Sequence, residues 1–143
     1  MESQIATHHD AEIILKLYDL RREALLRKAR QWMTAEFNPK TEEEFLAVVT
    51  DGSSQENAYF RQVITYWEMA ASLVVHGALM SDLFMDSNGE GIFIYAKLHD
   101  FRDAYQSKMG RPFMRLTAQL IERYPTARER FQAMLKAMQQ RSS

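Results

Sequence analysis

Apolar residues recur at helical spacing along most of the chain. Residues 94–105 and 113–124 each carry one apolar stripe, and a third follows near the C-terminus. No run alternates apolar and polar residues for long enough to indicate a strand. Three stripes on three helices need a common core, so the pattern predicts an all-α helical bundle. The third stripe has the i, i+4, i+7, i+8, i+11 spacing of one buried face and consists of Ala127, Phe131, Met134, Leu135 and Met138.

Helix starts are marked by Ser or Thr followed three residues later by Asp or Glu, a pairing that satisfies two free backbone amides. These pairs are Thr7–Asp10, Thr41–Glu44, Ser53–Glu56 and Thr126–Glu129. Gly110 and Pro125 are typical of helix ends. Together the signals predict helices at roughly 9–36, 42–50, 54–76, 78–86, 91–109, 113–124 and 127–140.

The segment 54–76 differs from the others because it is apolar around almost its whole circumference. A helix of that kind is usually surrounded by other helices. We therefore expect a single compact bundle of five to seven helices built around it. The chain forms one domain, 1–143, in which we expect the ends, 1–8 and 139–143, to fray.

The polar residues of this central helix lie on one narrow seam. Their steps of three and four residues place them within about one quadrant of the helix. The seam is either the solvent-facing edge of the helix or a polar strip that faces a cleft. In the second case it predicts a ligand site, whose candidate residues are Arg61, Glu68, Ser72 and His76.

The sequence gives little support for a metal site or a catalytic nucleophile. The chain has no cysteine, which excludes thiolate nucleophiles, zinc ribbons and iron–sulfur clusters. His8, His9 and Asp10 are the candidate metal ligands, but adjacent residues of a helix point about 100° apart. Motifs of zinc proteases, P-loops and dinucleotide-binding folds are absent. We therefore expect no metal site and no cofactor.

Charge is nearly balanced, with 18 Lys and Arg against 19 Asp and Glu, for a net charge of −1. Such a chain has no overall field to recruit nucleic acid or an anionic membrane, so neither is an expected partner. The N-terminal segment has no basic and apolar regions of a signal peptide. The uncharged stretch 69–81 is too short to span a bilayer, so we expect no transmembrane segment and a cytoplasmic location.

The middle of the chain, residues 40–105, resembles a type of small, all-helical bacterial domain of unknown function. The resemblance implies a helical domain and brings no established activity or catalytic residues. It also draws attention to Asn57 and Glu68. The matching residues are Asn57, Phe60, Tyr66, Trp67, Glu68, Gly77, Leu83 and Phe84.

Without catalytic motifs, the favoured function is a non-catalytic interaction or regulatory module that self-associates. A dimer is the expected homo-oligomer, because two-fold pairs are the commonest assemblies and helix 9–36 is long enough to form the interface. A separate protein partner is a further option. The alternative is a small-ligand binding protein with a pocket between the central helix and helix 91–109. A metal-dependent enzyme is the least favoured class.

Overall fold

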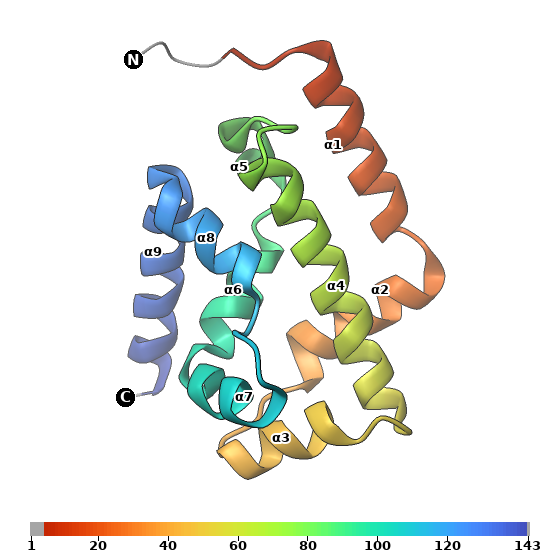
Figure 1. The fold of residues 1–143 in the computed structure, drawn as a ribbon, viewed down its shortest axis with the longest axis vertical. Coiled ribbons are helices and arrows are strands. Elements are labelled where there is room, and N and C mark those ends of the chain that lie inside the picture. The colour runs from red at the N-terminus through yellow and green to blue at the C-terminus, as the bar shows by residue number, and fades with distance from the viewer. Residues whose placement is uncertain (1–4, 143) are drawn as a thin grey trace.

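Helix α4, Gln55–Val75, runs through the middle of the molecule, with helices packed on several of its sides (Figure 1). The computed structural model describes residues 5–142. Helices α2, α3, α6 and α8 all pack against α4. Trp67 and Val63, near its centre, are almost completely buried. The buried central helix predicted over 54–76 is therefore confirmed, and it begins and ends one residue inside the predicted range.

All regular structure within residues 5–142 is helical, which confirms the all-α fold. This part of the chain has nine α-helices, more than the five to seven predicted, together with two short turns of π-helix and 3₁₀-helix. Besides α4, the elements in chain order are α1 His8–Arg21, α2 Ala24–Gln31, the π-helix η1 Trp32–Glu36, α3 Glu42–Thr50, α5 Ser81–Ser87, α6 Glu90–Lys97, the 3₁₀-helix η2 His99–Phe101, α7 Arg102–Met109, α8 Arg115–Arg123 and α9 Pro125–Ser142.

The higher count arises because two predicted helices are interrupted. The prediction of one helix over 9–36 is wrong, since the chain leaves helical geometry at Glu23, whose ψ is 139°. The Glu23 carboxylate accepts hydrogen bonds from the Leu25 and Leu26 amides and so starts α2. These bonds hold the pKa of Glu23 below its usual value. The predicted helix 91–109 is likewise divided into α6 and α7 by the 3₁₀ turn η2.

The predicted helix starts are mostly found in place. Thr7 and Asp10 form a reciprocal capping box at α1, and the Thr41 hydroxyl accepts from the Glu44 amide at α3. The start of α4 is capped by Ser54 instead of Ser53. Of the ends expected to fray, residues 1–4 and 143 lie outside the described residues, and α9 continues to Ser142.

The lower half of the bundle is organised around one aromatic side chain, that of Phe45 in α3, which is fully buried. Its ring stacks on Phe101 with 5.0 Å between the centroids. Phe60 of α4 and Phe113 meet it edge-on at 6.1 and 6.0 Å. Edge-on and offset ring pairs contribute about 1 kcal/mol each beyond the buried area. This cluster therefore links α3, α4, η2 and the segment before α8 into one core.

Candidate functional site

Glu68, the central residue of the predicted polar seam, caps another helix. One carboxylate oxygen accepts a hydrogen bond from the Leu116 amide at 2.9 Å. The other accepts from the Thr117 amide at 2.9 Å and the Thr117 hydroxyl at 2.7 Å. Helix α8 has no capping side chain of its own, since Met114 stands at that position. A carboxylate is favoured there because it meets free amides and the positive end of the helix dipole.

The other seam residues make separate local contacts and do not converge with Glu68. The Arg61 guanidinium donates to the Asn57 side chain at 2.8 Å. The Ser72 hydroxyl donates to the Met69 carbonyl of its own helix at 2.6 Å. His76 stands at the C-cap of α4 and is exposed. The four candidates therefore do not share one hollow, and a ligand site made of all of them stays a prediction.

Asn57, which the sequence resemblance singled out, joins α3 to α4. Its side-chain amide donates to the carbonyls of Val48 and Val49, both at 2.9 Å. These carbonyls lie in the last turn of α3, where carbonyls run out of helical partners; Val48 also accepts from the Asp51 amide at 3.4 Å. Asn57 is only 3% exposed, so its hydrogen bonds satisfy groups that water does not reach.

Asp10, one of the candidate metal ligands, is occupied by hydrogen bonds. Its carboxylate accepts from the Thr7 amide at 2.8 Å and from the Met80 amide, before α5, at 2.9 Å. These bonds hold the pKa of Asp10 below its ordinary value. The rings of His8 and His9 lie beside each other, with centroids 4.1 Å apart. Over residues 5–142, no group of three or more His, Asp or Glu side chains is placed to hold a metal ion.

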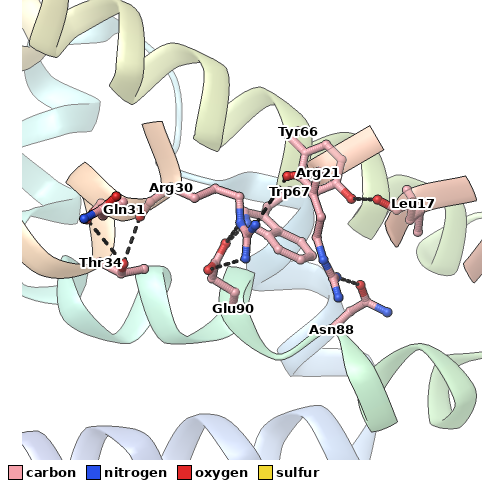
Figure 2. Close-up of polar contacts among 9 residues, drawn as sticks. All are labelled: Leu17, Arg21, Arg30, Gln31, Thr34, Tyr66, Trp67, Asn88 and Glu90. Atoms are coloured by element: carbon pink, nitrogen blue, oxygen red, sulfur yellow. Dashed lines mark hydrogen bonds and ion pairs between the residues drawn. The ribbon is translucent and has the colours of Figure 1, made fainter. Parts of the chain in front are cut away.

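A polar cluster that the sequence analysis missed joins α2, α4 and α6 (Figure 2). Arg30 of α2 forms a two-pronged ion pair with Glu90 of α6, at 2.7 and 3.0 Å. The indole N–H of Trp67 donates to the same carboxylate at 2.9 Å. Paired, charge-assisted hydrogen bonds of this geometry are among the stronger polar contacts in proteins. Glu90 therefore holds two helices against the start of α6.

Polar contacts also fix α1, which lies along the outer edge of the bundle (Figures 1 and 2). Arg21 donates to the Asn88 side chain at 2.5 Å, and the Tyr66 hydroxyl donates to the Leu17 carbonyl. Burial raises the pKa of Tyr66, so this donor keeps its proton well into the alkaline range. With Asp10 bonded ahead of α5, α1 is tied at its start, middle and end. Its position therefore does not depend on apolar burial alone.

Two basic side chains of the interior have lowered pKa values. Burial lowers the pKa of Lys97 to about 8. Its ammonium donates to the Met33 carbonyl, at the start of the π-helix η1, at 2.6 Å. Burial also lowers the pKa of His99, whose Nδ1 is enclosed without a partner among the described residues and whose ring meets Tyr95 and Phe131. Neither side chain lies in the groove described next.

An apolar groove follows the line where α1 and α2 meet α4. It consists of two neighbouring hollows of about 380 and 530 Å³, which share Leu20 and Met69. These two side chains are 46% and 42% exposed, high values for apolar residues inside a groove. We call it the α1–α4 groove. Its lining residues are Glu12, Ile13, Lys16, Leu17, Leu20, Glu23, Leu26, Gln62, Thr65, Tyr66, Met69 and Leu73.

Exposed apolar side chains concentrate in the N-terminal part of the chain, and two of those on the molecule, Leu20 and Met69, line this groove. Of the six large apolar residues that are exposed within residues 5–142, five lie between positions 5 and 25. The sequence carried a partial signal, because Ile13, Leu17 and Leu20 form one helical stripe while Leu15 and Tyr18 fall outside it. The sequence did not indicate that Met69 of α4 would be exposed, since its neighbours on that helix are buried. Which side of α4 remains uncovered depends on how the other helices pack.

The family of the chain follows from a match over most of its length. The family model described as "Domain of unknown function (DUF4760)" matches residues 6–124, and the chain belongs to this family. The match confirms the resemblance to a domain of unknown function and covers more of the chain than residues 40–105. No curated protein and no solved structure matches the chain. No helix among the described residues has the length and apolar character needed to cross a membrane.

Proposed function

We propose that this protein is an interaction module that pairs with a second copy of itself through the α1–α4 groove. The observation that carries the proposal is the half-exposed pair Leu20 and Met69 at the centre of the groove. Apolar patches of this kind on a domain surface are characteristic of interaction sites. A cytoplasmic, bacterial setting is part of the proposal and rests on composition and sequence resemblance.

The groove is suited to binding because its walls are already in place. Helix α1 is fixed by the hydrogen bonds of Asp10, Leu17 and Arg21, and α4 is the buried centre of the bundle. A preformed surface loses little conformational entropy when it binds. The exposed apolar side chains are therefore available without rearrangement of the helices.

Charges beside the groove favour a second copy over an anionic polymer or membrane. Glu12, Lys16 and Glu23 line it, so both signs occur side by side. In a two-fold interface, each contact between two different residues occurs twice, with the roles of the copies exchanged. Lys16 of each copy can then meet Glu12 or Glu23 of the other. A nucleic acid or membrane surface, which carries only negative charge, would instead be repelled by Glu12 and Glu23.

The exposed area sets the expected strength of the pair. Completing the burial of a half-exposed Leu or Met contributes about 1 kcal/mol. Leu20 and Met69 from two copies then supply about 4 kcal/mol, before the smaller contributions of the other lining residues. Association costs at least about 4 kcal/mol in lost freedom of motion. These two terms nearly cancel, so the net affinity comes from the other lining residues, and we expect a weak dimer that forms only toward millimolar protein concentration.

The test is the molar mass of the protein and two variants, measured by sedimentation equilibrium over a range of concentrations. Leu20→Glu places a charge in the groove, whereas Leu15→Glu makes the same change on the same helix at a side chain that is 67% exposed and outside the groove. We expect the mass of the wild type and Leu15→Glu to rise toward twice 16.7 kDa. Leu20→Glu should stay monomeric with an unchanged circular dichroism spectrum. A wild type that is monomeric at every concentration, or variants that behave alike, would overturn the proposal.

A further inference from the structure

A further hollow, which shares only Thr65 with the α1–α4 groove, lies where α4, α7 and the segment before α8 meet. It is a partly enclosed pocket of about 240 Å³. Ile64 of α4 and Met114 give it apolar walls, while Tyr105 of α7 and two arginines, Arg111 and Arg115, add polar groups. It lies between the central helix and α7, as predicted for a small-ligand pocket, but of the predicted residues Arg61, Glu68, Ser72 and His76 only Glu68 lines it.

Three hydrogen-bond donors around this pocket have no acceptor among the described residues. Tyr105 is only 6% exposed, yet its hydroxyl makes no hydrogen bond within residues 5–142. Arg111 places its guanidinium 5.9 Å from the centre of the Tyr105 ring. Within residues 5–142, neither Arg111 nor Arg115 forms an ion pair. The Tyr105 hydroxyl keeps contact with solvent, as do the two exposed arginines, so all three groups are free to donate hydrogen bonds to a ligand in the pocket.

Glu68 also lines the pocket but forms no ion pair with either arginine. Both oxygens of the Glu68 carboxylate accept hydrogen bonds from the first turn of α8. Its charge therefore offsets the partial positive charge of that helix end. The charged side chains that line the pocket, Glu68, Arg111 and Arg115, therefore sum to a net charge of +1, with both guanidinium groups free of ion pairs among the described residues.

The wall that carries the arginines is held in a defined conformation. Gly110 ends α7 at φ 76°, a left-handed conformation in which a side chain would be strained, and its amide donates to the Gln106 carbonyl. Phe113 and Met114 are then buried at 3% and 2% exposure, although Met114 itself has a φ of 46°. These two buried side chains lie between Arg111 and Arg115 in the chain and hold the segment that carries both arginines before any ligand arrives.

The geometry points to a binding site for a small organic carboxylate with an apolar ring. A guanidinium presents paired N–H donors that match the two oxygens of a carboxylate, and the Tyr105 hydroxyl supplies another donor. Ile64 and Met114 provide the apolar surface against which a ring packs. The pocket has the volume for one ring and its carboxylate, and a larger ligand would extend into solvent. This site does not depend on the pairing of two copies.

The test uses benzoate as the probe and benzyl alcohol as its neutral counterpart. Each is titrated into ¹⁵N-labelled full-length protein while the backbone amide signals are followed. We expect saturable shifts centred on residues 105–115 with benzoate, and a Kd of about 1 mM, typical of a ligand this small. Benzyl alcohol should bind at least about tenfold more weakly, since it offers no carboxylate to the arginines.

Variants separate the pocket from general attraction to positive charge. Arg111→Ala and Tyr105→Phe should each weaken benzoate binding, with a Kd about tenfold higher for the arginine variant. Arg27→Ala removes an exposed arginine of α2, outside the pocket, and should leave the Kd unchanged. The proposal is overturned if benzoate gives no saturable shifts, if Arg111→Ala and Arg27→Ala behave alike, or if inorganic phosphate binds as tightly as benzoate.

Discussion

Replacement of Glu68 by alanine should destabilise the protein through the loss of a helix cap supplied from outside that helix. The carboxylate receives two backbone amides and one hydroxyl from the start of α8, all within 2.9 Å. Hydrogen bonds to a charged group contribute about 1.5 to 3 kcal/mol each, and they are not additive. Thr117 is 2% exposed, so water cannot easily replace the lost acceptor. We expect the free energy of unfolding to fall by about 3 kcal/mol.

This loss is large enough to measure and small enough to leave a folded protein. Single domains have free energies of unfolding of about 5 to 15 kcal/mol. A loss of about 3 kcal/mol should lower Tm by roughly 6 to 12 °C for a chain of this size. Urea unfolding, followed by circular dichroism and by tryptophan fluorescence, gives the free energy directly. Hydrogen exchange should also show faster exchange of the Leu116 and Thr117 amides in the variant.

The matched control is Glu129→Ala, which makes the same change at an exposed position of α9. We expect that variant to lie within about 0.5 kcal/mol of the wild type. Combining Glu68→Ala with Thr117→Val then measures the coupling between the two side chains. Equal stability of Glu68→Ala and Glu129→Ala, or unchanged exchange at the start of α8, would refute the capping role.

Three further changes test other parts of the structure. Asn57→Ala should lower the free energy of unfolding by about 2 kcal/mol in urea, because the buried Val49 carbonyl loses its donor and the Val48 carbonyl keeps only the Asp51 amide. Gly91→Ala would place a Cβ 3.2 Å from that of Trp67 and should cost about 1 kcal/mol, whereas Gly52→Ala meets open space and should cost nothing in the same assay. For Lys97, the folded side chain loses its proton near pH 8 and the unfolded one near 10.5, so the unfolded state binds more protons between these values. The free energy of unfolding should then rise from about pH 8 to about pH 10 relative to that of Lys97→Met, and parallel pH profiles of the two proteins would contradict this cause.

Local signals account for what the sequence predicted correctly. Helix α3 lies at the predicted residues, since Thr41 and Glu44 are neighbours whose contact forms within the segment itself. The burial of α4 follows equally from its own composition. The break at Glu23 was missed because neither Gly nor Pro marks it, and a glutamate in the middle of a charged stretch is ordinary on a helix surface.

Contacts between distant segments account for what the sequence did not reveal. Glu68 meets a helix end 48 residues away, and Arg30 meets Glu90 across 60 residues. No spacing rule relates residues so far apart, because their contact depends on how whole helices pack. The same holds for the pocket in which Ile64 of α4 meets Tyr105 and Arg111. The sequence showed the polar seam on α4, but it did not show that the start of α8 would lie against Glu68.

Cross-linking of single-cysteine variants tests most directly whether two copies meet at the α1–α4 groove. The natural chain has no cysteine, so Leu20→Cys and Leu15→Cys each carry one thiol, on opposite sides of α1. A short bismaleimide should join Leu20→Cys into covalent dimers and leave Leu15→Cys almost entirely monomeric. Equal cross-linking of both variants, or cross-linking of Leu15→Cys alone, would contradict the groove as the pairing surface.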